Sequence, residues 1–178
     1  MIIRCNECGK PLRTRMKQRY VYRESGLTKV ILTGVKTFVC PGCRNELVEI
    51  PNIVGLHQTI AGALARKPAL LTPAEFRFVR KELRLKGKDL ARYLGTSNVN
   101  LSRWEAGDVP INPIADRLIR VLYAMKAVRS QRAIEPAKFL DGFLNLFDKL
   151  VSTKRPRPLP LEIPADRLAG DMATTTAR

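Results

Sequence analysis

The chain has 178 residues, and its 32 lysines and arginines against 16 aspartates and glutamates give a formal net charge of +16. Such an excess favours a polyanionic partner, most simply nucleic acid. No apolar run approaches the roughly 18 residues of a membrane-spanning helix, and the N-terminus lacks the apolar core of a signal peptide. We therefore expect a cytoplasmic protein with no membrane partner.

All four cysteines lie in residues 1–52, as Cys5-x-x-Cys8 and Cys40-x-x-Cys43. Two thiolates separated by two residues can bind one ion from a single turn, and four thiolates suit tetrahedral Zn²⁺ with no position left open for catalysis. Disulfides are rare in the cytosol. The alternatives are a redox-active dithiol pair and an iron–sulfur cluster. The spacing predicts a structural zinc module over 1–52.

Two runs between the cysteine pairs are typical of β-strands, Arg19–Arg23 and Lys29–Val39. The second run is rich in β-branched residues, and Gly34 within it predicts a bend or a bulge. A hairpin of these runs would bring the two cysteine pairs together. We expect so small a core to depend on the metal.

Residues 53–72 are predicted to link two domains through a helix that runs from Ile53 to Arg66 and ends at Lys67-Pro68. Apolar residues recur on one face of this helix at helical spacing. His57, the one histidine of the chain, is expected to be a partly exposed residue of the helix rather than a metal ligand or a catalytic base.

A capping box predicts the start of the next helix. Thr72 is the expected N-cap, Pro73 takes the first helical position and Glu75 the third, which together satisfy free N–H groups at a helix start. We predict an all-α domain over 73–130, so the expected fold class is α+β. Its first helix should pack Phe76, Val79 and Leu83 on Leu90, Leu94 and Leu101.

The stretch from Leu85 to Gly107 predicts a short helix, a tight turn and a second short helix. Gly95 can take the positive φ that the turn demands, and Leu101 and Trp104 share the inward face of the second helix. Two helices of a small bundle, with no DNA, are the alternative. The candidates for contact with base edges or phosphates in a major groove are Lys86, Gly87, Lys88, Ser97, Asn98, Val99, Asn100 and Arg103.

Three further segments follow. A helix from Pro113 to about Val128 carries more apolar surface than a small domain needs, and dimerisation is one use for it. An amphipathic helix is predicted within 131–153, either as core or as a partner surface. Residues 154–178 are proline-rich, and we expect an extended and then disordered tail.

The helical stretch resembles the Cro/repressor-type (XRE) helix-turn-helix family over about 73–127. The matching residues are Leu90-Ala91, Gly95-Thr96-Ser97 and Ser102-Arg103-Trp104-Glu105-Ala106-Gly107. Gly87 and Asn98 stand where that family often has glutamine. Phosphate anchoring at the first of these sites would then fall to backbone N–H groups and to Lys86 or Lys88. The resemblance implies DNA binding.

The order of the two modules resembles the YgiT/MqsA-type antitoxins, in which a CxxC…CxxC module precedes a Cro-type helix-turn-helix. The pieces that match are Cys5-Asn6-Glu7-Cys8, Val35–Val39 leading into Cys40-Pro41-Gly42-Cys43, and Glu46. The resemblance implies a zinc module that contacts a toxin RNase and a helix-turn-helix half that dimerises on a palindromic operator and represses its own operon.

Three functions compete at this point. The first is an antitoxin and autorepressor that binds double-stranded DNA as a homodimer. The second is a free-standing zinc-containing transcriptional regulator with no toxin partner. The third, a thiol oxidoreductase, is the weakest, because the sequence holds no phosphate loop, no paired carboxylates and no serine placed beside its single histidine by a motif. We therefore expect a protein that is not an enzyme.

Overall fold

The computed structural model describes residues 3–130 and 156–169. These residues divide into two units. Of the described residues, the sheet unit comprises 3–23, 29–56 and 160–169, and the helical unit comprises 24–28, 57–130 and 156–159. A small β-sheet in one unit and a set of helices in the other confirm the expected α+β class. No helix in the described ranges is long and apolar enough to cross a lipid bilayer.

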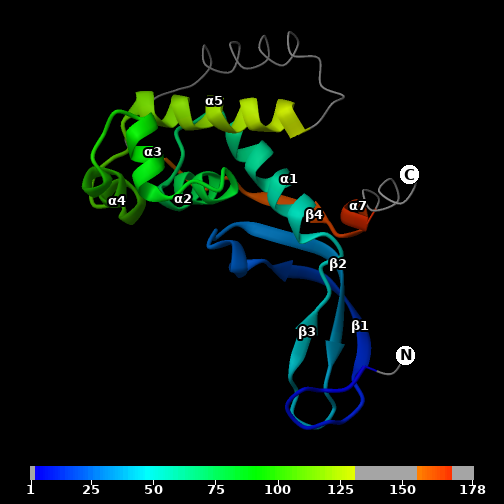
Figure 1. Ribbon diagram of the computed structural model, residues 1–178. Helices are drawn as coiled ribbons and strands as arrows, with labels where there is room; N and C mark the ends of the chain where they lie inside the picture. The colour runs from blue at the N-terminus through cyan, green and yellow to red at the C-terminus, as the bar shows by residue number, and fades with distance from the viewer. Residues whose placement is uncertain (1–2, 131–155, 170–178) are drawn as a thin grey trace. The chain divides into compact units, whose positions relative to one another are not determined.

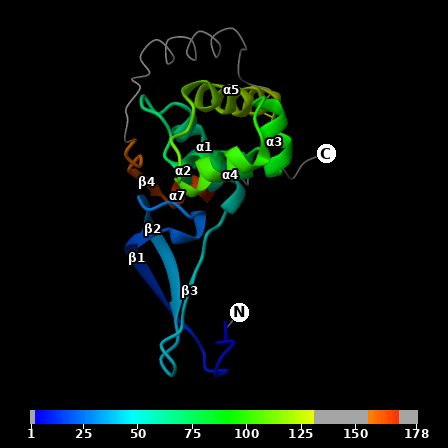
Figure 2. The same cartoon turned by 90° about the vertical axis from the view of Figure 1, so that its left-hand side faces the viewer.

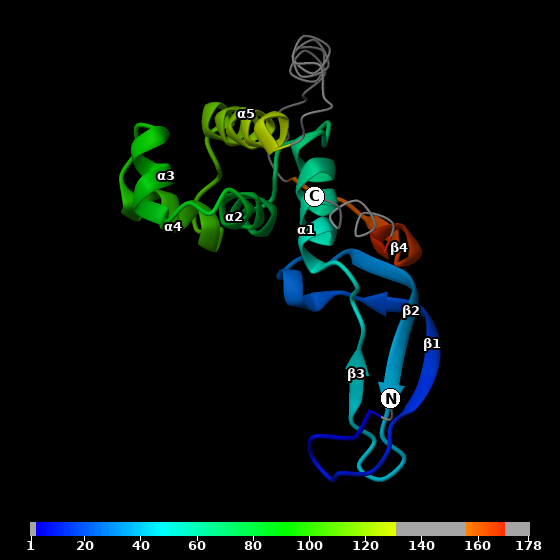
Figure 3. The same ribbon diagram turned by 45° about the vertical axis from the view of Figure 1, so that its right-hand side comes forward.

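The sheet unit is built around one central strand (Figures 1 and 3). This strand is β2, Val30–Val39, and it pairs antiparallel with β1, Arg13–Val21, along one edge. Its other edge pairs antiparallel with β3, Glu46–Val48, and parallel with β4, Leu161–Pro164. β1 begins earlier than the sequence predicted, and β3 and β4 were not predicted at all.

Gly34 divides β2 into two halves. Val30 and Leu32 are buried before it, whereas Val35 and Thr37 are buried after it, so the buried side changes from even to odd positions. The φ of Gly34 is +65°, a conformation that glycine adopts without a Cβ clash. The predicted bend is therefore confirmed, and it separates the half that pairs with β4 from the half that pairs with β3.

The segment expected to be extended forms strand β4 at Leu161–Pro164, and the expectation of disorder is wrong for residues 165–169. Leu161 N–H donates to the Lys29 carbonyl at 2.9 Å, and Ala165 N–H donates to the Thr33 carbonyl at 2.8 Å. Pro164 falls between these donors, at a position whose missing N–H the ladder does not need. The short helix α7, Asp166–Ala169, follows. Residues 170–178 lie outside the described part of the chain.

Five helices form most of the described part of the helical unit, and Figure 2 shows their arrangement. They are α1, Ile53–Ala65, whose first turn belongs to the sheet unit; α2, Pro73–Glu82; α3, Gly87–Tyr93; α4, Asn98–Ala106; and α5, Pro113–Ser130. Helix α2 contacts α4 and α5, and α3 contacts α4. The helix predicted within 131–153 lies outside the described residues.

The core of the helical unit forms where α2 meets α4. Phe76 and Trp104 meet edge to face, with ring centroids 6.4 Å apart. Val79, Leu90 and Leu101 are also buried, whereas Leu83 and Leu94 are only half-buried. The capping box at Thr72 is confirmed, because its hydroxyl accepts from the Glu75 N–H at 3.3 Å. The α2 helix therefore starts where the sequence predicted.

Two buried ion pairs fix the segment between α1 and α2. Lys67 contacts Glu75 at 2.6 Å, and Arg120 contacts Asp116 at 2.8 Å. Arg120 also donates to the carbonyls of Lys67 and Ala69, both at 2.6 Å. Buried charges are costly unless they are paired and hydrogen-bonded. All four groups are paired, and each makes at least one hydrogen bond, although Asp116 Oδ2 and Arg120 Nε meet only as an ion pair. Residues 66–72 are therefore a fixed part of this unit rather than a loose linker.

Candidate metal centre and candidate nucleic-acid interface

Each CxxC pair is held by a backbone turn, and the two turns are of the same kind. In the first, the Gly9 N–H donates to the Cys5 carbonyl at 2.9 Å, and in the second the Arg44 N–H donates to the Cys40 carbonyl at 3.0 Å. Gly9 has a φ of +71° and Arg44 has a φ of +61°. This turn places both thiols of a pair on one side of the backbone. Arg44 adopts the left-handed conformation without being glycine, so the surrounding turn imposes it.

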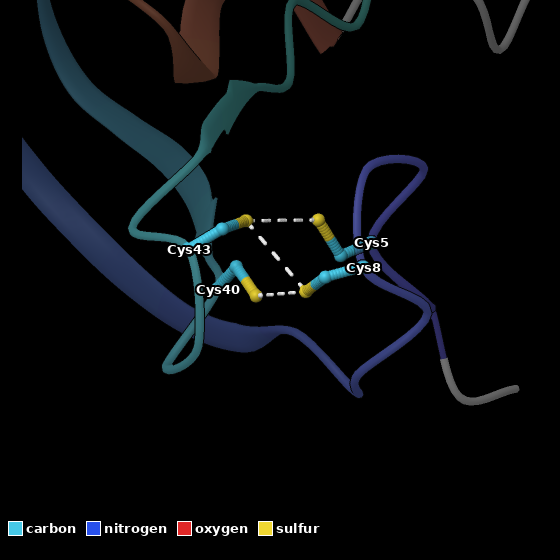
Figure 4. A group of neighbouring side chains, drawn as sticks. All are labelled: Cys5, Cys8, Cys40 and Cys43. Carbon is cyan, nitrogen blue, oxygen red and sulfur yellow. Dashed lines mark hydrogen bonds between the residues drawn. The ribbon is translucent and has the colours of Figure 1, made fainter.

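The four Sγ atoms converge from two loops, one before β1 and one between β2 and β3 (Figure 4). They all lie within 4.8 Å of one another. The separations are 3.5 Å for Cys5 and Cys43, 3.3 Å for Cys8 and Cys40, and 3.7 Å for Cys8 and Cys43. A disulfide would need about 2.05 Å, and all four cysteines are free. A tetrahedral ion with metal–sulfur bonds of about 2.3 Å would set its ligands roughly 3.8 Å apart.

Three close sulfur contacts join the two loops, which favours a shared metal ion over a redox-active pair within one loop. A redox-active CxxC forms its disulfide within one loop, whereas the three contacts here run from Cys5 and Cys8 to Cys40 and Cys43. The side chain of Asn45 also donates to that of Asn6 at 3.2 Å, which joins the two turns directly. The site could therefore bind a metal ion, and its four ligands would make that ion structural.

The close packing of the four thiols shifts their pKa values in opposite directions. The Cys43 and Gly42 N–H groups point at the Cys40 sulfur and, against the effect of burial, lower the pKa of the Cys40 thiol to about 6. The Asn45 N–H acts in the same direction on Cys43, but the neighbouring thiols and burial together raise the pKa of Cys43 to about 12. Four thiolates cannot share this space without a cation. A divalent ion among them would stabilise all four.

The helices α3 and α4 form the pair that the sequence predicted, joined by a tight turn. Gly95 in that turn has a φ of +63°. Ser97 is the N-cap of α4, and its hydroxyl accepts from the Asn100 N–H at 3.1 Å. Leu101 and Trp104 face the core with 1% and 6% of their surface exposed. Among the described residues, Asn98, Val99 and Arg103 lie exposed on the outer face of α4.

The candidate DNA-contacting residues divide by exposure. Gly87 and Asn100 are half-buried. A Cβ at Gly87 would lie 2.9 Å from Oδ1 of Asn98, so Gly87 lets the start of α3 approach the start of α4. The Asn100 amide donates to the Thr96 hydroxyl at 2.9 Å and is held to the turn. The exposed candidates are Lys86, Lys88, Ser97, Asn98, Val99 and Arg103.

A pairing that the sequence reading missed holds α4 against α2. Arg80 donates to both carboxylate oxygens of Glu105, at 2.5 and 2.8 Å, and to the Leu85 carbonyl at 2.9 Å. The hydrogen bonds to Glu105 raise the pKa of Arg80 against the effect of burial. A glutamate in the last turn of a helix opposes the helix dipole, and this was the available signal that Glu105 needs a cation beside it.

No protein-family model, curated protein or solved structure matches this chain. Its function is therefore inferred from its own residues. Two features stand out among those described: a cluster of four cysteines that closes one end of a small sheet, and a short helix whose outer face is polar and exposed.

Proposed function

We propose that this chain is a sequence-specific DNA-binding transcriptional regulator whose α4 helix enters the major groove. The separation of the two faces of α4 carries the proposal. Leu101 and Trp104 are buried, whereas side chains able to read base edges are exposed on the other face. Arginine pairs with guanine, asparagine pairs with adenine, and an apolar group contacts the thymine methyl. On α4 these groups are Arg103, Asn98 and Val99.

The charges around α4 support this proposal. Arg80 neutralises Glu105, the one acidic residue of α4. Phosphate contacts position a protein on the duplex, while base contacts give it specificity. The cations available for phosphate contact are exposed on α2, on α3 and in the turn between them: Lys81, Lys86, Lys88 and Arg92. Arg77 is also exposed and lies 4.0 Å from Glu105.

The regulator would act as a homodimer on a palindromic operator. Two recognition helices related by a twofold axis enter successive major grooves when they are about 34 Å apart. In the sheet unit, the proposed ion is Zn²⁺, since four cysteine sulfurs within 4.8 Å of one another suit zinc and leave no open position. The zinc would hold Cys5, Cys8, Cys40 and Cys43 together and take no part in catalysis.

The antitoxin function is the more specific form of this proposal. Its support is the order of the parts, a tetrathiolate module ahead of a helix-turn-helix arrangement in one chain. In that form the sheet unit contacts an RNase toxin and the regulator represses its own operon. Co-expression with the product of a neighbouring reading frame tests it. Co-purification and relief of that product's toxicity are expected, and a neighbour that neither binds nor poisons the cell would leave a free-standing regulator.

The DNA-binding function is tested by selecting a duplex from a random-sequence pool with the full chain. Arg103→Ala should then weaken binding to the selected duplex by about 1–3 kcal/mol and relax the choice of one base. Lys88→Ala should weaken all duplexes alike and reduce the salt slope by about 1. Arg66→Ala, an exposed arginine at the end of α1, is the matched control. Unchanged binding by Arg103→Ala would show that α4 does not read this DNA.

A further inference from the structure

Strand β1 carries a cation at every second position. Arg13, Arg15, Lys17 and Arg19 alternate with uncharged residues, and side chains two apart in a strand point to the same face. The row therefore lies on one face of β1 and spans about 20 Å, at roughly 3.4 Å for each residue. Its three arginines are exposed, and Lys17 is partly exposed.

Little in the sheet unit neutralises this row. Residues paired across an antiparallel ladder share a face, and the β2 partners of the four cations are uncharged: Val39, Thr37, Val35 and Thr33. Lys17 contacts Glu46 of β3 at 3.0 Å. Within the described ranges, Arg13, Arg15 and Arg19 have no ion pair. Three guanidinium groups in a line thus present their donors to solvent.

We propose that this cation row binds the phosphate backbone of double-stranded DNA. The planar guanidinium fork matches a phosphate bidentately. A duplex carries about one charge for each 1.7 Å of its axis, so a row of about 20 Å can meet several phosphates. Single-stranded nucleic acid also needs aromatic platforms for its bases. Among the described residues, the ring that lies against a cation of the row is that of Tyr20, 5.7 Å from Lys17 Nζ, and it is half-buried.

This surface goes beyond the proposed function, which assigns base reading to α4, and it does not depend on α4. It would supply affinity that is independent of sequence, since phosphate contacts carry no base information. The competing explanation is protection of a sheet edge, because charged side chains on an exposed strand prevent pairing with other chains. Edge protection predicts self-association when the charges are removed, with no loss of DNA affinity.

The test uses the full-length, zinc-loaded protein and a 30-base-pair duplex of mixed sequence. In the variant R13Q/R15Q/R19Q, the slope of log K against log salt should become shallower by about 2–3, because each lost phosphate contact removes roughly 0.9. Affinity at about 0.1 M salt should fall at least tenfold. The matched control K10Q/K29Q/R167Q removes three exposed cations of the same unit that lie outside β1, and its slope should change by less than about 1.

A second variant separates charge from folding. R13K/R15K/R19K keeps the charges, so it should retain the salt slope to within about 1. Arg103→Ala on the same duplex distinguishes the two proposals. If the triple glutamine variant loses affinity while Arg103→Ala binds every duplex normally, the row is upheld and the role of α4 is refuted. The proposal for the row is refuted if the triple glutamine variant binds duplex DNA like its control. This holds whether the variant self-associates or loses binding only to single-stranded RNA or only to phosphatidylserine vesicles.

Discussion

The two units hold themselves together by different means. The sheet unit has a central strand β2, a partner β1 of similar length, two short strands and a cluster of four cysteines at one end, and β4 comes from more than 120 residues later in the chain. The helical unit has capped helices, a continuous apolar core and two ion pairs that are fully or almost fully buried. A sheet with so few strands buries little apolar surface. We expect the helical unit to be stable without a metal site of this kind.

This difference predicts which changes each unit tolerates. The stability of the sheet unit should depend on its cysteine metal ligands and on long-range strand pairing. A single substitution can remove either of these. In the helical unit, stability should depend on packing and on the pairing of buried charges. Four substitutions, taken from the largest expected effect to the smallest, test this contrast.

Loss of the proposed zinc ion should have the largest effect. Structural zinc contributes on the order of 10 kcal/mol to the folding of small zinc modules, so Cys40→Ser should unfold the sheet unit and leave the helical unit folded. Elemental analysis should give about one zinc for each wild-type chain. Amide NMR spectra should lose the dispersed β-strand signals in Cys40→Ser and keep them in Thr14→Ser, an exposed change on β1. Retained sheet signals without metal would refute this account of the sheet unit.

Breaking a buried ion pair should be the next largest effect. Asp116 and Arg120 are fully buried, and Asp116 also accepts from the Leu71 N–H at 2.8 Å. Asp116→Ala leaves the Arg120 charge without its partner, which typically costs 3–5 kcal/mol. Urea unfolding followed through helical signals measures this loss. Arg117→Ala, the neighbouring half-buried arginine, should cost less than about 1 kcal/mol, and equal losses in the two variants would contradict the role of the pair.

Removing a buried side chain from β4 should destabilise the sheet unit by about 2–4 kcal/mol. Ile163 is 7% exposed and pairs in register with Leu32 of β2. Glu162 is the exposed neighbour on the same strand. Ile163→Ala should therefore raise the exchange rates of β2 amides with solvent, whereas Glu162→Ala should leave them nearly unchanged. Indistinguishable exchange in the two variants would show that β4 does not stabilise the sheet.

Loss of the α2 cap should have the smallest effect of the four. Thr72→Ala removes the hydroxyl that accepts from the Glu75 N–H, and such caps contribute about 0.5–2 kcal/mol. The melting temperature of the helical unit should fall by a few degrees. Ser102→Ala, an exposed change on α4, is the control. Equal melting temperatures for Thr72→Ala and this control would show that the capping box does not stabilise the helical unit.

The sequence predicted features that depend on local patterns. The cysteine spacing predicted the cluster, the Thr72–Glu75 box predicted where α2 starts, and Gly95 and Gly34 predicted a turn and a bend. Each of these signals acts within a few residues, through φ values, caps or ligand spacing. The sequence therefore located the cysteine site and the helix pair without any knowledge of tertiary contacts.

Features that depend on distant partners were missed. β4 pairs with a strand about 130 residues earlier in the chain, and its proline-rich flank resembles a disordered tail. The Arg80–Glu105 and Lys67–Glu75 pairs join residues whose proximity appears only after the helices pack. Side-chain periodicity shows which residues are inside but not what they meet. Strand addition and buried ion pairing are tertiary events, which explains both omissions.

The central claim is that α4 reads the DNA, and amide chemical-shift mapping on the selected duplex tests it most directly. Phosphate contacts weaken steeply with salt, whereas base contacts made inside a groove weaken less. At moderate salt we expect large shifts in Ser97–Arg103 and smaller shifts along β1. As salt rises, the β1 shifts should vanish before those of α4. If the amide chemical shifts in the N-terminal half of α4 do not change on DNA binding at any salt concentration, the claim is contradicted.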